Sequence, residues 1–271
     1  MKAPTLSPHE RVDRVNANLQ LIQNLKGLTY GTDAYLLSAF IKPNPRGRAV
    51  ELGAGSGIIS LLCATTGRFS HITAVEIQPT YAELIAKNAA LNGLEDKVTP
   101  LCRDLRDLTP ADLGGEVEAV FANPPYMKVN AGKRNLTDEK YQARHEVNGD
   151  VDDFCHGAYR LLKHGGRFTC VWRPDRLTDL LAALRAHHLE PKEMVFVQAD
   201  AHTRPAMVLV EAKKGGSSGL ILHPTLLLKQ DIDGKLLPDE RAEEIYRTLT
   251  FPRGGALRQG ANPKPAKREE L

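Results

Sequence analysis

The stretch EAVFANPPYMK, residues 118–128, places residue types suited to molecular recognition at the end of an apolar run. The run up to Ala122 reads as a core strand, but Pro125 cannot donate a sheet hydrogen bond, and Asn123, which precedes a proline, is driven toward extended geometry. The strand should therefore stop at Asn123. Beyond it stand an amide oxygen and a rigidly held carbonyl, which accept hydrogen bonds, and the ring of Tyr126, which offers a face for stacking.

A second group of candidate residues lies in VELGAGSG, where a strand passes into a helix. Gly53, Gly55 and Gly57 would let the backbone approach a ligand closely and direct helix N–H groups toward it. The next strand ends in an acid, Glu76, where such folds hydrogen-bond a ribose, and Asp104 follows the third strand. Tight packing is the alternative explanation for the glycines, and helix capping is the alternative for Asp104.

The elements that must position these residues alternate between apolar runs of strand length and longer segments of helical period. We expect strands at 48–53, 71–77, 97–102, 117–122, 167–172, 193–198 and 206–212, and helices at 57–67, 80–93, 152–162 and 176–188. The short stretch 199–205 cannot hold a parallel crossover, so the last two strands should form an antiparallel hairpin at the sheet edge. The expected fold class is α/β, a seven-stranded Rossmann-like sheet with this terminal hairpin.

Composition supports one large domain with extensions: 271 residues, of which 42% are hydrophobic and 25% are charged. No apolar run is long enough for a membrane span and the N-terminus lacks a signal-peptide core, so we expect a soluble cytoplasmic protein. Four cysteines (63, 102, 155 and 170) lack ligand spacing, which favours buried thiols over a metal site. The net charge of +3 permits a nucleic-acid partner without requiring one.

The glycine spacing narrows the choice of nucleotide. GxGxG differs from the GxGxxG of dinucleotide folds, and no GK[ST] is present for a triphosphate. With its strand-end acids and terminal hairpin, the chain resembles the class I S-adenosylmethionine-dependent methyltransferases. The resemblance implies S-adenosyl-L-methionine as the cofactor, with its methionine part on the three glycines, its ribose on Glu76 and its adenine amino group on Asp104. The remaining expected cofactor contacts flank these motifs: Glu51, Ile77, Leu105 and Asn123.

The NPPY motif, residues 123–126, is similar to the catalytic motif of methyltransferases that act on a planar amine or amide nitrogen. Such a nitrogen has a delocalised lone pair and must become more tetrahedral to attack a methyl group. The Asn123 oxygen and the Pro124 carbonyl can accept its two N–H bonds and favour the developing positive charge, while Tyr126 stacks the extruded base. Asn123, Pro124 and Tyr126 are thus the predicted catalytic residues, and no metal is required.

Further segments resemble the bacterial family that methylates N6 of adenine-37 in valine tRNA: 19–40, 143–147 and 204–216. The resemblance implies that Gly31, Thr32 and Asp33 lie over the methionine end of the cofactor. From the residues alone, 20–31 reads as two short strands turning at Lys26 and Gly27, and Thr32 or Asp33 as a helix cap. Residues 217–249 depart from the shorter members of that family.

The expected partner is RNA, by this resemblance a tRNA, and basic residues near the site are candidate phosphate contacts. They are Lys128, Lys133, Arg134, Arg144, Lys213 and Lys214. Acids at 138, 139 and 146 leave a merely solvated loop as the alternative. We expect an N-terminal extension at 1–45, the methyltransferase domain at 46–215, a C-terminal extension at 216–252 and a flexible tail at 253–271.

Other functions share these motifs. NPPY also serves glutamine N5 methylation of release factors, but that class usually carries an N-terminal helical domain, and only about 45 residues precede the first strand here. DNA adenine methyltransferases normally add a target-recognition domain. A non-catalytic RNA-binding assembly factor that keeps the fold would be expected to have a damaged cofactor site, whereas the glycines, the acids and NPPY are all in place.

Overall fold

A mixed sheet of nine strands runs through the computed structural model, which describes residues 6–25, 30–124 and 149–253. Its order is β10-β8-β9-β7-β6-β3-β4-β5, and β11 also pairs with β8. The strands are β3 (Asn44–Leu52), β4 (Phe69–Glu76), β5 (Val98–Cys102), β6 (Val117–Ala122), β7 (Leu162–Trp172), β8 (Leu189–Gln198), β9 (Met207–Lys214), β10 (Ile221–Leu222) and β11 (Leu226–Leu227). All seven expected strands are present, and the count of seven was short by the two-residue strands β10 and β11.

The direction of the strands agrees with the expected class. Strands β3, β4, β5, β6 and β7 pair in parallel, whereas β9 is antiparallel to both β7 and β8. The predicted terminal hairpin is therefore confirmed. Strands β10 and β11 pair with β8 in parallel, so they extend the sheet beyond that hairpin.

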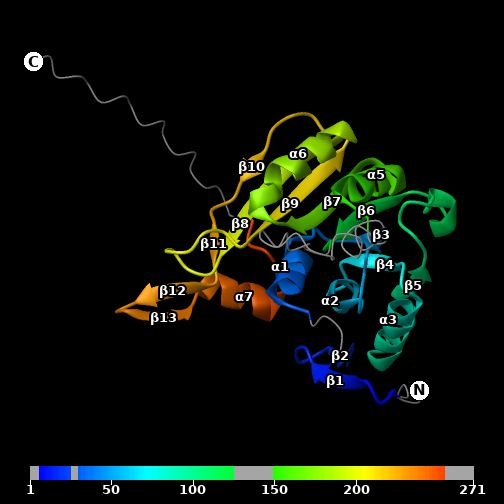
Figure 1. Cartoon of the computed structure of the whole chain (residues 1–271), viewed down its shortest axis with the longest axis horizontal. Coiled ribbons are helices and arrows are strands. Elements are labelled where there is room, and N and C mark those ends of the chain that lie inside the picture. Colours follow the sequence, from blue (N-terminus) through cyan, green and yellow to red (C-terminus); the bar gives the residue numbers. More distant parts are fainter. Residues whose placement is uncertain (1–5, 26–29, 125–148, 254–271) are drawn as a thin grey trace, which may run out of the picture.

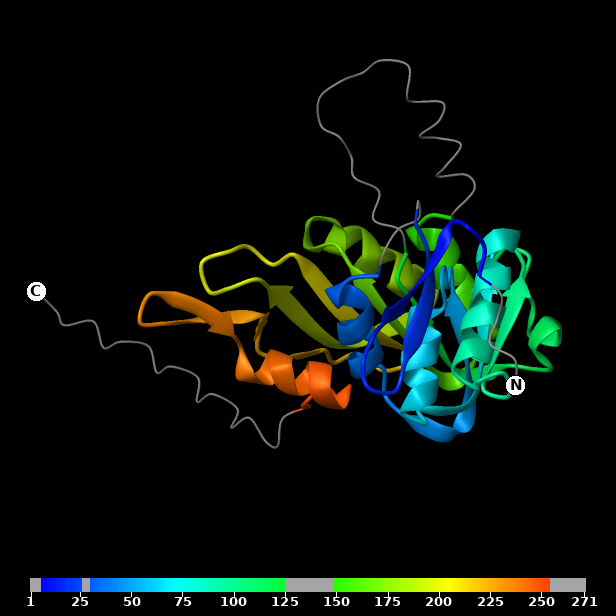
Figure 2. The ribbon, with the colours of Figure 1, turned by 90° about the horizontal axis from the view of Figure 1, so that it is seen from below.

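Helices cover both faces of the sheet (Figures 1 and 2). They are α1 (Thr32–Phe40), α2 (Ile58–Thr65), α3 (Pro79–Leu91), α5 (Val151–Leu161), α6 (Leu177–Ala186) and α7 (Glu240–Thr248), with the 3-10 turns η1 (Pro110–Leu113) and η2 (Pro174–Arg176). Among the described residues, no helix is long and apolar enough to cross a membrane.

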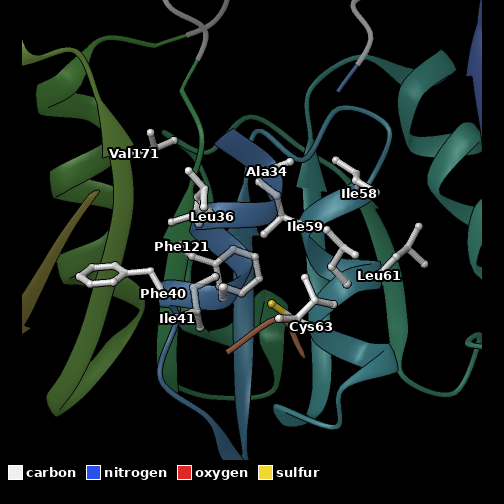
Figure 3. Packing of buried hydrophobic residues seen from close by; sticks show 14 of the residues in the cluster. Ala34, Leu36, Phe40, Ile41, Ile58, Ile59, Leu61, Cys63, Phe121 and Val171 are labelled. Carbon is white, nitrogen blue, oxygen red and sulfur yellow. The ribbon is translucent and has the colours of Figure 1, made fainter. Parts of the chain in front are cut away.

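Two hydrophobic clusters form the core, one on each face of the sheet. Val120 and Phe121 are neighbours on β6, yet they belong to opposite clusters because successive strand side chains point to opposite faces. Phe121 packs with residues of α1 and α2, including Phe40 and Ile59 (Figure 3). Val120 lies in the cluster built with α5 and α6. The apolar run that predicted a strand at 117–122 thus supplies side chains to both layers of the core.

The N-terminal segment forms a separate hairpin, β1 (Glu10–Arg14) with β2 (Gln20–Asn24). The far edge of β2 is held by two side-chain amides of α3. Asn88 accepts from the Ile22 N–H at 2.6 Å and Asn92 accepts from the Gln20 N–H at 2.9 Å, and both amides donate back to the same residues' carbonyls. Strand β2 thus takes its partner from upstream, and the turn predicted at Lys26 and Gly27 lies outside the described residues.

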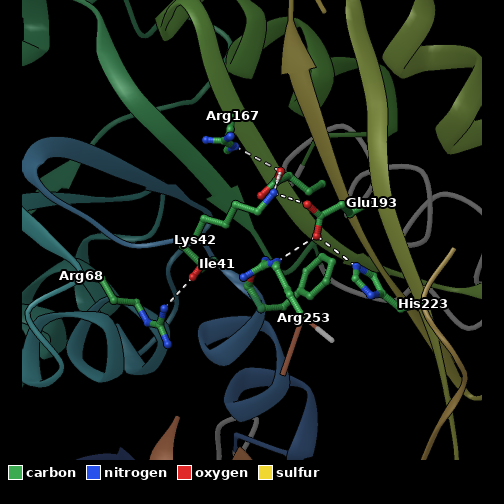
Figure 4. Close-up of polar contacts among 9 residues, drawn as sticks. Ile41, Lys42, Arg68, Arg167, Glu193, His223 and Arg253 are labelled. Carbon is green, nitrogen blue, oxygen red and sulfur yellow. Dashed lines mark hydrogen bonds and ion pairs between the residues drawn. The ribbon is translucent and has the colours of Figure 1, made fainter. Parts of the chain in front are cut away.

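A partly buried cluster of charges joins the C-terminal segment to the sheet (Figure 4). Lys42 contacts Glu193 of β8 and donates to Glu211 of β9 at 2.7 Å, while Arg253 and His223 approach the other Glu193 oxygen at 2.8 and 3.1 Å. Burial alone would raise the pKa of Glu193, but the hydrogen bonds from Lys42, Arg253 and His223 outweigh it and hold the pKa at about 2. His223 and Arg253 belong to the segment beyond β9, which also carries the hairpin β12 (Lys229–Ile232) and β13 (Lys235–Pro238).

Arg68 makes a second connection to the same segment. Its side chain is buried and donates to the Ile41 carbonyl, just after α1, at 2.6 Å and to the Leu249 carbonyl, just after α7. The guanidinium has no side-chain counterion among these contacts, so the two carbonyls are what compensate its burial. Arg68 therefore holds the ends of α1 and α7 together.

Replacing Arg68 by Ala should destabilise the fold, because it leaves two buried carbonyls without a donor. We expect the free energy of unfolding to fall by about 3 kcal/mol, measured by urea denaturation. Arg68→Lys should lose less, since an ammonium still reaches one carbonyl. An unfolding midpoint for Arg68→Ala equal to that of the wild type would contradict the role given to this contact.

Candidate active site

The carboxyl ends of four parallel strands meet at one edge of the sheet. The register aligns Leu52 of β3 with Val75 of β4 and with Ala122 of β6, and Glu76 with Cys102 of β5. The chain runs outward from β3 to β5 and then returns to the other side of β3 as β6, so the strand order reverses at this point. A cavity of about 530 Å³ opens there.

Most of the predicted cofactor residues line this cavity. Those that do, with the catalytic Pro124, are Gly31, Asp33, Glu51, Gly53, Gly55, Glu76, Ile77, Asp104, Leu105 and Asn123. Thr32 and Gly57 are not among the lining residues: Thr32 is the first residue of α1, and Gly57 is the N-cap of α2.

Some predicted residues are not brought to the cavity or cannot be placed. Tyr126, Lys128, Lys133, Arg134 and Arg144 lie outside the described residues. Lys213 and Lys214 end β9, where Lys213 pairs with Arg167, the residue of β7 that is aligned with Ala119 of β6. They therefore lie toward the amino-terminal ends of the parallel strands, away from Asn123. Lys214 there donates to the Leu162 carbonyl at 2.5 Å.

The glycine loop has the backbone that its sequence requires. Gly53, Gly55 and Gly57 have φ values of 69°, 54° and 80°, in the left-handed region that favours glycine. A side chain at Gly57 would also come within 3.1 Å of Ile85. At Gly55, in contrast, no other atom lies within 4 Å of where a Cβ would stand. Backbone strain explains all three glycines, and tight packing adds to it only at Gly57.

Glu76 connects β4 to the glycine loop. One carboxylate oxygen accepts from the Gly55 N–H at 2.9 Å, and the other accepts from the Gln78 N–H at 3.0 Å. A carboxylate has about four acceptor positions, so Glu76 retains capacity for further donors in the cavity.

Glu51, at the end of β3, is a carboxyl buried beneath the same loop. One of its oxygens accepts from the Ser60 N–H at 2.9 Å and also from the Ser60 hydroxyl. Burial raises the pKa of Glu51 to about 8, because the Ser60 hydrogen bonds only partly offset the loss of solvation and Glu76 adds repulsion. Glu51 is therefore mostly protonated at pH 7.

Asp104 lines the cavity while its carboxylate is held by Arg106. It accepts from the Arg106 backbone N–H at 2.9 Å and forms an ion pair with the guanidinium at 2.6 Å. The hydrogen bonds from the Arg106 side chain hold the pKa of Asp104 below its ordinary value. The bond to the Arg106 backbone closes a local turn and does not cap a helix, because no helix begins between β5 and η1 in this described part of the chain.

Asn123 is bound to Asp33 across the cavity edge. The Asn123 amide nitrogen donates to an Asp33 oxygen at 2.8 Å, whereas the Asn123 amide oxygen is buried and accepts no hydrogen bond from the residues that the structure describes. Asp33 lies in the first turn of α1, whose N-cap is Gly31 without a side-chain cap bond. The prediction that Thr32 or Asp33 caps this helix was therefore wrong, because the helix already includes both residues.

Sequence reasoning missed several residues of the cavity wall. Tyr30, Tyr81, Arg103 and Phe154 line it together with the predicted positions. Arg103 directly precedes Asp104 in the sequence, so the predicted position of Asp104 could have indicated that Arg103 also lines the cavity. Phe154 lies on α5, beyond the segment 125–148, and packs near Gly53; its apolar character was explained equally well by the core. No local pattern distinguished it.

Two solved methyltransferase structures illustrate the similarity of fold. A predicted O-methyltransferase from Agrobacterium tumefaciens superposes with a TM-score of 0.64 at 18% identity, over 81% of this chain and 97% of that one. Methanocaldococcus jannaschii TYW2, solved in complex with AdoMet, gives a TM-score of 0.52 at 15% identity, over 78% and 89% of the two chains. Residues 40–129 also match the model of the TRM5/TYW2 methyltransferase domain. The fold and the position of the cavity are thus those of methyltransferase structures.

Two proteins of similar sequence indicate the family within the methyltransferases. Enzymes named tRNA1(Val) (adenine(37)-N6)-methyltransferase are 30% identical in Dickeya chrysanthemi, over 81% of this chain and 85% of the relative, and 28% identical in Porphyromonas gingivalis, over 72% and 81%. The chain belongs to the tRNA1(Val) (adenine(37)-N6)-methyltransferase family.

The raised pKa of Glu51 makes stability depend on pH. Between the ordinary pKa of 4.5 and the folded pKa of about 8, the folded chain holds a proton that the unfolded chain has lost, so the free energy of unfolding should fall as pH rises. Glu51→Gln should flatten this fall by up to about 1.4 kcal/mol per pH unit. Urea denaturation at several pH values measures it.

The matched control is Glu83→Gln, which removes a carboxyl from the exposed side of α3. That side chain is exposed, so its replacement removes a carboxyl without disturbing a buried contact, and the pH slope should change less than in Glu51→Gln. If Glu51→Gln and the wild type have the same slope, the carboxyl of Glu51 is not held protonated by burial.

Proposed function

We propose that this enzyme transfers a methyl group from S-adenosyl-L-methionine to N6 of adenine-37 in valine tRNA, acting in the cytoplasm. Membership of the family and the names of its relatives support the reaction and the substrate. The structural observation that carries it is the unpaired, buried amide oxygen of Asn123 at the edge of the cavity. Such an acceptor suits an N–H donor of the substrate.

The chemistry of the cavity fits this cofactor. Its volume of about 530 Å³ lies within the range usual for ligands of this size. The open space beside Gly55 would admit the amino-acid part, Glu76 has acceptor positions left for ribose hydroxyls, and Asp104 is an acceptor for the adenine amino group. When bound, S-adenosyl-L-methionine supplies a methyl group already activated by its sulfonium.

The work of the chain is then to hold and orient the amine. The Asn123 oxygen and the Pro124 carbonyl accept the two N–H bonds, which turns the nitrogen lone pair away from both acceptors. As the nitrogen gains positive charge, the same two dipoles stabilise it without having to reorient, because β6 and the proline hold them. Alignment does most of the catalysis, and no nucleophilic residue is needed.

The chain's organisation follows from the same proposal. We assign the methyltransferase domain to 46–215, with the extensions 1–45 and 216–252 packed on it and a tail at 253–271. The contacts of β2 with α3, of β10 and β11 with β8, and of His223 with Glu193 support the two extensions. The ion pair of Arg253 with Glu193 places the first residue of the range assigned to the tail against the domain as well. Tyr126, outside the described residues, is assigned to stack the base.

Asn123→Ala tests the mechanism. Turnover should fall by about two to three orders of magnitude while cofactor affinity stays nearly unchanged, because the lost interaction is strongest in the transition state. The assay is methyl incorporation into unmodified tRNA, beside a release-factor peptide that carries glutamine. Full activity of Asn123→Ala on either substrate would refute the mechanism. Transfer to the peptide and not to RNA would replace the substrate class and favour glutamine N5 methylation.

Phosphate contacts are tested by the salt dependence of tRNA binding. Lys133→Ala with Arg134→Ala should weaken binding and reduce the slope of log K against log salt by up to about one per residue. Lys213→Ala removes a charge at the opposite edge of the sheet, so comparing the two slopes shows which edge faces the tRNA. An unchanged slope in the double variant would favour the alternative, in which the loop 127–149 is solvated and does not contact phosphates.

A further inference from the structure

We propose that Asp33 is a positioning residue, which orients the Asn123 amide so that its oxygen and not its nitrogen faces the substrate amine. The inference rests on the proposed N-methylation and concerns how its acceptor is prepared. The contact that carries it is the 2.8 Å hydrogen bond from the Asn123 amide nitrogen to an Asp33 oxygen. The two residues are far apart in sequence and meet only because α1 lies over the end of β6.

The ambiguity of an amide explains why such a partner is needed. Asn presents an acceptor and a donor of nearly the same shape, and rotation about its last bond exchanges them. A rotated Asn123 would direct N–H groups at the amine, which also presents N–H groups, and the lone pair would not be aligned. An ionised carboxylate only accepts hydrogen bonds, so it selects the orientation in which the nitrogen faces Asp33. The opposite atom is then the buried, unpaired oxygen.

The sequence around Asp33 makes room for this contact. A side chain on Gly31 would place its Cβ 2.8 Å from the second oxygen of Asp33, so a larger residue at 31 would push the carboxylate aside. Asp33 also lies in the first turn of α1, where the helix dipole favours a negative charge. The residues Gly31 and Asp33 thus act as a pair: one leaves space and the other fills it.

The remainder of α1 is held by contacts with three other parts of the chain. Tyr35 packs edge-on against Tyr246 of α7 with their ring centres 5.7 Å apart, and its hydroxyl donates to the Val15 carbonyl at 2.6 Å. At the far end, Arg68 holds the Ile41 carbonyl. The segment beyond β9 therefore contributes to the site, because its helix α7 packs against α1, which carries Asp33.

This role differs from contact with the cofactor's methionine end, and kinetics separate the two. A residue that only binds the cofactor changes its Kd and KM, and saturating cofactor restores turnover. A residue that orients Asn123 changes kcat at saturating cofactor. Asp33→Ala should lower kcat at least about 30-fold under saturation, since misalignment of about 1 Å can cost 100-fold. Asp33→Asn, which keeps the shape but allows both amide orientations, should lower kcat less.

A reversed pair supplies the decisive test. Asn123→Asp alone places two carboxylates in contact and should be nearly inactive. Adding Asp33→Asn lets the new amide at 33 donate to the new carboxylate at 123, which leaves an acceptor facing the amine. We expect the double variant to regain at least about tenfold in kcat over Asn123→Asp, which a merely structural role for Asp33 would not produce.

The outcomes distinguish this inference from the proposed function. Asp33 variants with wild-type kcat at saturating cofactor, or a double variant no better than Asn123→Asp, would overturn it even though Asn123→Ala is inactive. Wild-type protein without methyl transfer to any nitrogen would instead refute the function itself. Asp96→Asn, an exposed carboxylate before β5, is the matched control and should keep wild-type kcat. Cofactor calorimetry on each variant confirms that the site is folded.

Discussion

The parallel register of β3 with β4 and β6 is the constraint on which the site depends. Because these strands end at the same level, the residues that follow each of them lie at one edge: the glycine loop after β3, Glu76 at the end of β4 and Asn123 after β6. The reversal of strand order at β3 leaves the space between them. A shift of two residues in any one strand would move its end by about 7 Å relative to the others.

Partly buried charges join the segment beyond β9 to the sheet at some cost in stability. Lys42, Glu193 and Arg253 lie in a part of the structure where hydrophobic side chains of similar volume would often be at least as stable. Ion pairs, however, are directional, and each of these joins segments distant in the chain to one geometry. Arg68 does the same with two carbonyls. We interpret them as the contacts that hold α1 and the segment beyond β9 in one arrangement.

The elements predictable from sequence are those that depend on local pattern. Apolar runs of strand length predict the seven long strands and the end of β4. The short stretch between β8 and β9 predicts their hairpin, and the prolines after Asn123 predict the end of β6. What failed required contacts between distant segments. The partner of β2 is chosen by β1 and by amides of α3, and Asp33 meets Asn123 across 90 positions of sequence. The position of Lys213, in contrast, follows from the antiparallel direction of β9, which carries its end away from the site.

The charges around the cavity explain why one carboxyl is kept neutral. Asp33, Glu51, Glu76 and Asp104 all line it, and Arg103 is the cationic residue of its wall among the described residues. Four ionised acids would repel one another. Burial raises the pKa of Glu51 to about 8, so at pH 7 this carboxyl keeps its proton and the repulsion is reduced. The proposed cofactor carries an ammonium and a sulfonium, either of which would favour the ionised form of Glu51. Binding would then release a proton, so affinity for the cofactor should increase as the pH approaches the pKa of Glu51 from below.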